Sequence, residues 1–378
     1  MKPAYKVPTM EEIRALPWNG FTCASTFSGC GGSSTGYRMA GFKMVWASEF
    51  IDAARESYKA NAAPYTVVDG RDIRQVKAED ILSATGLKAG ELDLFDGSPP
   101  CSAFSTAGKR EAGWGTVKKY SDKAQRVDDL FFEYTRLIRG LRPKVFVAEN
   151  VSGLVKGTAK GYFLQILAEL KACGYRVSCK VLDAQWLGVP QARQRTIFVG
   201  VRDDLGFDPV HPKPLPYRYS VRDALPWIKD MSSNSSHVQT WVGSDRPAPT
   251  VTATIPTKSL QVEAETDISR YAIGNEWDKL KPGEGSEKYL NLKRTRLDGP
   301  SHCISATGGG NGVAGVTYPT EKRKFTIAEL KCICGFPDDF ILTGTYAQQW
   351  ERLGRAVPPV MMSHIAATVR DEILRKIK

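Results

Sequence analysis

Short apolar segments alternate with helical patterns from residue 21 to residue 201, and this alternation constrains the fold more than any other feature. The apolar segments are rich in β-branched and aromatic residues and span 21–27, 42–48, 66–68, 92–97, 144–150 and 195–201. Between them, residues 128–138 and 161–173 place apolar side chains at the spacing of one helix face. Strands that alternate with helices form a mostly parallel sheet with helices on both faces. The sequence therefore predicts an α/β fold.

The residue composition and pattern of the chain change near residue 205. Proline is frequent at 211–216, serine at 232–237 and glycine at 306–315, and no long helical pattern is present. Helical patterns return at 326–334 and at 361–377. We therefore expect a large α/β domain at 1–204, a smaller loop-rich domain at 205–320, and a C-terminal segment at 321–378 that returns to the first domain.

Composition narrows the class of protein. Lys and Arg number 52 against 41 Asp and Glu, a net charge of +11, which favours a polyanionic partner such as nucleic acid; a well-solvated surface is the alternative. No run approaches the ~18 apolar residues of a membrane helix, and residues 1–14 have no secretory apolar region. The eight Cys form no CxxC pair and the four His are scattered, so we expect reduced thiols and no metal site.

A glycine-rich segment follows the first predicted strand. Phe27-Ser-Gly-Cys-Gly-Gly32 leads into a predicted helix, where bare backbone N–H groups favour a ligand. Glu49 ends the next strand about 20 residues later, at the place of a carboxylate that binds ribose hydroxyls. Asp72 and Ile73 follow the third strand and suit an adenine amino group and ring. The pattern predicts an adenosine cofactor, with a simple tight turn as the alternative.

Reactive side chains follow three later strands. Cys101 lies in Gly97-Ser-Pro-Pro-Cys-Ser-Ala-Phe-Ser105, fixed by two prolines, and is a candidate nucleophile or an ordinary thiol. Glu149 ends the strand at 144–150 and is a candidate general acid or a surface carboxylate. Arg193 and Arg195 face the same side of an extended segment, where they could bind a carbonyl or phosphate or form a solvated pair.

Taken in order, these segments resemble the DNA cytosine-C5 methyltransferases over nearly the whole chain. The matching segments are FSGCGG, SPPCSAFS, AEN-V, GVPQARQR and GRAVPP, with LFFEYTRLIRGLRPKVFVAENV and RLDGPSHCISATGGG…KFTIAELKCICGFPDDF between them. RPAPTVTA at 246–253 also resembles the family's ninth motif, but KFTIAEL follows the later copy at the usual distance. The resemblance implies a Rossmann-like methyltransferase sheet at 1–204 and a target-recognition domain at 205–320.

The resemblance also implies a mechanism and a set of site residues. The Cys101 thiolate would add to C6 of a cytosine flipped out of the duplex, which activates C5 as a nucleophile. Glu149 would hold N3 and the exocyclic amine, Arg195 would contact O2, and Arg193 would support the pocket. Ser102 and Ser105 would line the substrate pocket. The implied contacts to S-adenosylmethionine or a relative come from Phe27, Gly29, Cys30, Gly31, Glu49, Phe50, Asp72, Ile73, Pro100, Leu130, Arg355, Ala356 and Val357.

Two positions depart from the family's pattern. Ser102 stands where the family usually has Gln, and Arg355 stands where it usually has Asn. A permanent charge ~5 Å from a sulfonium would cost about 3 kcal/mol at an effective dielectric near 20. A carboxylate on the transferred carbon would instead pair with Arg355. We therefore favour the hypothesis of carboxymethyl transfer from carboxy-S-adenosylmethionine to give 5-carboxymethylcytosine. Ordinary methylation is the alternative, with Arg355 pointing to a DNA phosphate or pairing with a nearby acid.

Other classes of function would share part of this pattern. A tRNA cytosine methyltransferase would share the chemistry, but the long region at 205–320 favours double-stranded DNA. A non-catalytic DNA-binding relative would not need Cys101, Glu149, Arg193 and Arg195 together. A nicotinamide oxidoreductase would share the glycine loop alone. We expect a monomer in the cytoplasm of a bacterial or phage-infected cell.

Overall fold

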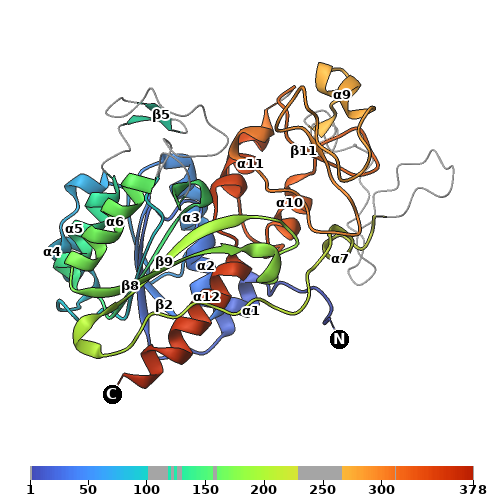
Figure 1. Cartoon of the computed structure of the whole chain (residues 1–378). Helices are drawn as coiled ribbons and strands as arrows, with labels where there is room; N and C mark the ends of the chain where they lie inside the picture. The colour runs from blue at the N-terminus through green and yellow to red at the C-terminus, as the bar shows by residue number, and fades with distance from the viewer. Residues whose placement is uncertain are drawn as a thin grey trace.

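The computed structural model contains one seven-stranded sheet in the order β3-β2-β1-β4-β7-β9-β8 (Figure 1). It describes residues 2–100, 118–120, 123–125, 130–155, 160–228, 266–310 and 312–377. Neighbouring strands from β3 to β7 pair parallel, whereas β9 pairs antiparallel with both β7 and β8. The predicted mostly parallel sheet is therefore confirmed.

Each of the six predicted strands is present close to its expected position. They are β1 (Thr22–Thr26), β2 (Lys43–Ser48), β3 (Val67–Asp69), β4 (Leu94–Gly97), β7 (Val145–Val151) and β9 (Gln194–Arg202). Sequence reasoning missed β8 (Tyr175–Asp183) at the edge of the sheet. This strand alternates apolar and polar residues and is largely half-exposed, so it lacks the continuous apolar run that marked the buried strands.

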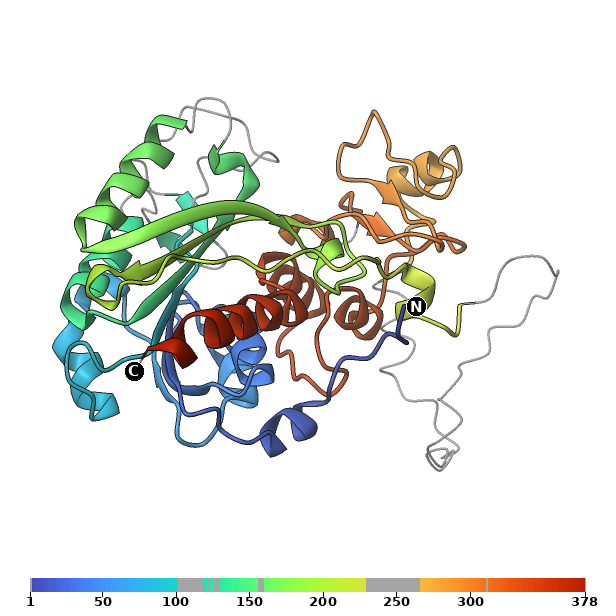
Figure 2. The ribbon, with the colours of Figure 1, turned by 60° about the horizontal axis from the view of Figure 1, so that its bottom comes forward.

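Helices cover both faces of the sheet (Figure 2). Helices α4 (Ala78–Thr85), α5 (Leu130–Leu141) and α6 (Lys160–Ala172) share one hydrophobic core with sheet residues such as Phe95 and Phe146. Helices α2 (Gly32–Met39) and α12 (Pro359–Glu372) share a second core with Leu94 and Val145. Successive residues of one strand thus serve opposite cores, as the two-residue period of a strand requires.

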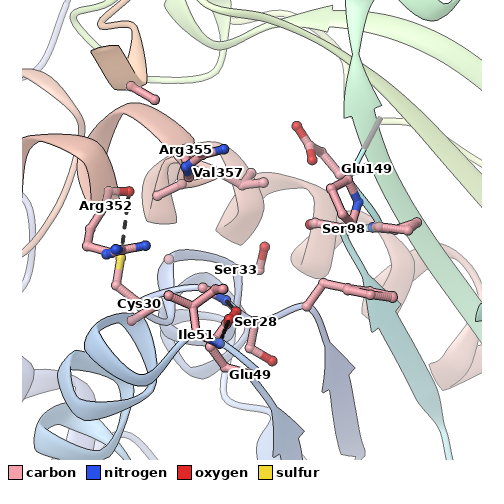
Figure 3. Close-up of a pocket in the computed structure, with 18 of the residues that line it drawn as sticks. Ser28, Cys30, Ser33, Glu49, Ile51, Ser98, Glu149, Arg352, Arg355 and Val357 are labelled. Carbon is pink, nitrogen blue, oxygen red and sulfur yellow. Dashed lines mark hydrogen bonds between the residues drawn. The ribbon is translucent and has the colours of Figure 1, made fainter. Parts of the chain in front are cut away.

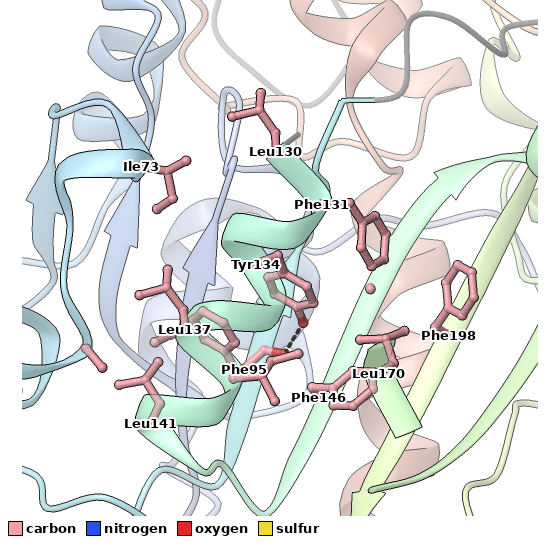
Figure 4. Close-up of a cluster of buried hydrophobic side chains, with 14 of the residues drawn as sticks. Ile73, Phe95, Leu130, Phe131, Tyr134, Leu137, Leu141, Phe146, Leu170 and Phe198 are labelled. Carbon is pink, nitrogen blue, oxygen red and sulfur yellow. Dashed lines mark hydrogen bonds between the residues drawn. The ribbon is translucent and has the colours of Figure 1, made fainter. Parts of the chain in front are cut away.

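A buried tyrosine joins α5 to the middle of the sheet (Figure 4). The Tyr134 hydroxyl donates to the carbonyl oxygens of Phe95 and Val147, with both distances 3.0 Å. Its ring stacks on Phe95 with centroids 5.1 Å apart. Because these bonds reach β4 and β7 together, they help to fix β4 against the strand that carries Glu149.

A third core lies beside the sheet and unites distant parts of the chain. It contains Met10 and Ile13 of the N-terminal segment, Val221 and Leu225, and the buried side chains of 304–353. The remaining elements are α1 (Met10–Ala15), α3 (Asp52–Asn61), α7 (Val221–Ala224), α9 (Ala272–Trp277), α10 (Ile327–Ile333), α11 (Tyr346–Arg355), β5 (Lys118–Tyr120), β6 (Lys123–Gln125), β10 (Lys293–Arg294) and β11 (Val316–Thr317). Among the described residues, no helix is long and apolar enough to span a membrane.

The predicted C-terminal helices are confirmed with small shifts at their ends. Helix α10 begins after Thr326, whose side chain forms a capping box with Glu329. Helix α12 begins at Pro359, ends at Glu372 and is followed by a 3-10 turn at Leu374–Lys376. Sequence reasoning missed α11, because its sequence YAQQWERLGR offers few apolar residues.

The close packing of β7 on β9 gives a test of the fold. A Cβ atom added at Gly200 of β9 would overlap the ring of Phe146, which is fully buried. We expect Gly200→Ala to lower the free energy of unfolding by about 1–3 kcal/mol, because the ring must move within a packed core. Urea denaturation followed by circular dichroism measures the change.

Gly161→Ala is the matched control for this substitution. Gly161 lies in α6, and a Cβ atom there would meet nothing within 4 Å. Alanine favours a helix over glycine, so this variant should be unchanged or more stable by up to about 1 kcal/mol. Equal destabilisation of both variants would contradict the packing described here.

Candidate active site

A cavity of about 500 Å³ opens at the carboxyl ends of the parallel strands (Figure 3). Most of the residues predicted for the site line it, namely Phe27, Gly29, Cys30, Glu49, Phe50, Asp72, Ile73, Pro100, Leu130, Glu149, Arg193, Arg195, Arg355, Ala356 and Val357. Gly31 is absent from the lining, although Gly32 is present. Cys101, Ser102 and Ser105 lie outside the described residues. The strand order thus brings the predicted cofactor and base residues of the described chain to one cavity.

The glycine loop turns sharply between β1 and α2. Phe27, Gly29 and Gly31 have φ angles of 53°, 56° and 100°, in the left-handed region. Gly31 is the N-cap of α2. A Cβ atom added to Gly31 would lie 3.1 Å from Cδ2 of the Tyr58 ring. A side chain at Gly32 would overlap the carbonyl oxygen of Val357. Gly31 therefore shapes the turn, while Gly32 lets the C-terminal segment approach the loop.

Glu49 connects the glycine loop to the end of β2. Its carboxylate accepts one hydrogen bond from the backbone N–H of Gly29 at 2.8 Å and one from that of Ile51 at 2.7 Å. Burial raises the pKa of this carboxyl group, although the two backbone hydrogen bonds and Arg352 oppose the shift. Each carboxylate oxygen retains a second acceptor position, so hydrogen bonds to ribose hydroxyls remain compatible with this arrangement.

Asp72 lies in the loop that follows β3 and lines the cavity. Its side chain accepts from the backbone N–H of Arg74 and caps a 3-10 turn at Ile73–Gln75. The carboxylate also pairs with the Arg74 guanidinium at 3.1 Å. Ile73 is buried in the core beside it. This places an acid and an apolar side chain together in the cavity, as the sequence predicted.

Glu149 and Arg195 form an ion pair in the part of the cavity that faces β7 and β9. The Arg195 Nε atom lies 2.7 Å from Glu149 Oε1, and their side chains are only 13% and 10% exposed. Burial lowers the pKa of Arg195, with a further lowering by Arg193. In Figure 3, Glu149 stands across the cavity from Glu49 and Cys30. The pair thus places a carboxylate and a guanidinium side by side in the cavity.

Arg193 and Asn150 hold the walls of the cavity in place. The Arg193 side chain is buried and donates to the carbonyl oxygens of Ile304 at 3.1 Å and Gly354 at 2.8 Å. Asn150 donates to the carbonyl oxygen of Pro99 at 3.2 Å. Arg193 therefore connects two chain segments that line the cavity.

Arg355 ends α11 and lines the cavity beside Ala356 and Val357. Its Nε atom lies 2.7 Å from Glu351 Oε1, one helical turn earlier, and its side chain is 32% exposed. The structure therefore shows the pairing with a nearby acid that was one of the alternatives for this residue. The negative charge of Glu351 offsets the repulsion that Arg355 would exert on a cationic cofactor.

Sequence reasoning missed several side chains of the cavity. Among them are Ser28, Ser33, Ser98, Cys303, Ser305, Thr307 and Arg352. Residues 303–307 belong to the segment RLDGPSHCISATGGG, so the resemblance could have placed them near the site but did not say which side chains face it. Arg352 carries no signal in the sequence, because its burial depends on how α11 packs.

Comparisons with known proteins agree with this geometry. Residues 21–371 match the model of the C-5 cytosine-specific DNA methylase family. The Type II methyltransferase M.NgoFVII of Neisseria gonorrhoeae is 32% identical, covering 91% of this chain and 85% of its own length. The Type II methyltransferase M1.HphI of Haemophilus parahaemolyticus is 29% identical, covering 92% and 86%.

Solved structures share the fold. A protein of E. coli described as a prophage-encoded DNA modification methyltransferase superimposes with a TM-score of 0.70 at 20% identity, covering 94% of this chain and 100% of its own. Spodoptera frugiperda DNMT2 superimposes with a TM-score of 0.62 at 17% identity, covering 93% and 100%. The matched segments of the sequence, the cavity at the strand ends and the family model lead to one conclusion: the chain belongs to the C-5 cytosine-specific DNA methylase family.

Proposed function

We propose that this protein methylates C5 of cytosine in double-stranded DNA, with S-adenosylmethionine as the methyl donor. The observation that carries the proposal is the single cavity in which the Glu149–Arg195 pair faces the glycine loop and Glu49. A polar ring bound by the pair would therefore lie opposite a cofactor bound by the loop. Family membership supplies the reaction class.

The residues of the cavity suit a cofactor of this kind. A volume of about 500 Å³ is within the range of small-molecule sites. Glu49 and Asp72 would bind polar groups of the adenosine, while Ile73 and Leu130 supply apolar surface. When bound, the cofactor supplies an electrophilic carbon.

We infer the roles of the base-side residues from their positions. Glu149 would accept a hydrogen bond from the exocyclic amine of a flipped cytosine and, as a general acid, donate a proton to N3 as negative charge develops on the ring. Arg195 would donate to the ring carbonyl. Cys101 would supply the attacking thiolate; its chain neighbour Pro100 lines the cavity. A base must leave the duplex to reach these groups.

Carboxymethyl transfer from carboxy-S-adenosylmethionine is a second candidate function, because Arg355 lines the cavity. In that reaction Arg355 would break its ion pair with Glu351 and pair instead with the carboxylate of the donor. The present pairing at 2.7 Å favours the ordinary donor, since it leaves the local charge compensated.

The partner in this proposal is double-stranded DNA. The net charge of +11 suits a polyanion, and residues 205–320 would form the domain that reads the target sequence, with 1–204 and 321–378 forming the catalytic part. The bacterial relatives named above are Type II methyltransferases. We propose a monomeric enzyme in a bacterial or phage-infected cytoplasm.

Glu149→Gln tests the base-side pair. Removing the carboxylate leaves Arg195 without its charged partner and weakens the stabilisation of the cytosine ring, so methyl transfer should fall by about 10²–10⁴-fold. Binding of S-adenosylhomocysteine should change by less than about twofold, because Glu149 stands across the cavity from Glu49 and the glycine loop. Tritium transfer to unmodified bacterial DNA and calorimetry measure the two effects.

Glu169→Gln is the control, because Glu169 forms a similar pair with Arg139 at 2.6 Å outside the cavity. This variant should retain full transfer. Full activity of Glu149→Gln would refute the assigned role.

Arg355→Asn tests the identity of the donor. The protein is incubated with DNA or tRNA and with each donor separately, and the modified nucleosides are identified by mass spectrometry. We expect 5-methylcytosine in DNA from S-adenosylmethionine, and an equal or higher yield from the Arg355→Asn variant. A carboxymethyl product that disappears in this variant would establish the second candidate instead. Modification of tRNA alone would contradict the DNA substrate.

A further inference from the structure

A buried carboxyl group lies beneath the glycine loop and has no place in the mechanism above. Asp96 of β4 is 1% exposed and does not line the cavity. It accepts a hydrogen bond from the Ser25 hydroxyl at 2.8 Å and one from the Tyr37 hydroxyl at 3.0 Å. Both donors are fully buried, so this carboxyl group depends on a small internal network rather than on water.

The network continues to the cofactor side of the cavity. The Ser28 hydroxyl lies 3.0 Å from Ser25 Oγ and 3.1 Å from the Ser25 carbonyl oxygen, and can donate to either. Ser28 belongs to the glycine loop and lines the cavity beside Glu49 (Figure 3). A chain of three side chains therefore connects the buried carboxyl group to the cofactor loop, in the order Asp96, Ser25, Ser28.

The direction of the hydrogen bonds depends on the charge of Asp96. An ionised carboxylate only accepts, so the Ser25 hydroxyl points to Asp96 and its oxygen accepts from Ser28. A protonated carboxyl group donates one hydrogen, which can reverse the Ser25 hydroxyl toward Ser28 Oγ. In the ionised state the Ser28 oxygen can therefore offer lone pairs to the cavity, above a buried negative charge. Both features favour a cationic ligand group.

We propose that Asp96 is a positioning residue that orients the Ser28 hydroxyl and, through its negative charge, favours the sulfonium form of the cofactor over the neutral thioether. The inference rests on the proposed function, since it names the ligand of the same cavity. Asp96 acts through Ser25 and Ser28 and does not itself touch the ligand.

The surroundings of Asp96 place its ionisation near neutral pH. Desolvation by burial raises the pKa of Asp96 to about 7. The hydrogen bonds from Ser25 and Tyr37 lower this pKa, and the negative charge of Glu149 raises it. The titratable groups that interact with it from the neighbouring elements are Cys23 of β1, Tyr37 of α2, Tyr58 of α3, Tyr134 of α5 and Glu149 of β7. Burial raises the pKa of this cysteine and of the three tyrosines, so they stay neutral near pH 7.

Asp96 is mostly protonated at pH 6 and mostly ionised at pH 8, so affinity for the sulfonium should rise with pH across this window. By linkage, a cation that binds better to the ionised state must also release protons from Asp96 near pH 7. The neutral thioether should show a smaller rise.

Calorimetry of the protein without DNA tests the inference. The affinities of S-adenosylmethionine and S-adenosylhomocysteine are measured from pH 6.0 to 8.5 for the wild-type protein and for Asp96→Asn. From pH 6 to pH 8, the preference for the sulfonium should grow by roughly fivefold in the wild-type protein and stay constant in the variant. Titrations at pH 7 in buffers of different ionisation enthalpy should show proton release for the wild-type protein only.

Two further variants separate this role from a merely structural one. Asp93→Asn removes another buried carboxyl group, which directly precedes β4, pairs with Lys144 at 2.7 Å and does not line the cavity. This variant should keep the wild-type pH profile. Ser28→Ala removes the outer member of the network and should at least halve the pH-dependent preference, even if Asp96→Asn does not fold.

The outcomes distinguish the inference from the proposed function. An equal growth of the sulfonium preference in the wild-type protein and in Asp96→Asn, or an unchanged preference in Ser28→Ala, would overturn the inference alone. Failure of the wild-type protein to bind either ligand at any pH would overturn the proposed function and the inference with it.

Discussion

The ion pair between Glu149 and Arg195 exists because β9 runs antiparallel to β7. Glu149 lies near the carboxyl end of its strand, whereas Arg195 lies at the start of β9, and the antiparallel pairing brings these ends to the same edge of the sheet. A parallel strand at this position would place Arg195 at the opposite edge, far from the glycine loop. The antiparallel direction of β9 thus places a guanidinium directly beside the Glu149 carboxylate.

A second constraint is the closure of the cavity by the C-terminal segment. Gly32 leaves room for the carbonyl oxygen of Val357, and Arg193 donates to the carbonyl oxygen of Gly354. These contacts join residues more than 160 positions apart, so the site is complete only when both ends of the chain are folded. The same closure brings Arg355 to the cavity together with the compensating charge of Glu351. Glu351 therefore offsets the positive charge that Arg355 brings to the cavity.

Much of the fold and the site could be predicted from the sequence, since both depend on local patterns. Continuous apolar runs located the buried strands, and the order of the motifs located Glu149, Arg193 and Arg195. The edge strand β8 and the polar helix α11 could not be predicted in this way, because their stability depends on neighbours that are distant in sequence. The pairing of Arg355 with Glu351 was only one of several alternatives, and the network around Asp96 joins residues 71 positions apart.

The most direct test of the account is covalent trapping on a mechanism-based substrate. DNA of mixed sequence in which 5-fluorocytosine replaces cytosine is incubated with the protein and S-adenosylmethionine, and the adduct is located by mass spectrometry of the digested complex. Fluorine at C5 prevents the final elimination, so we predict a stable protein–DNA complex linked through the sulfur of Cys101 and absent from Cys101→Ser. A wild-type protein that modifies ordinary DNA but forms no such complex, or forms it through another residue, would contradict the account.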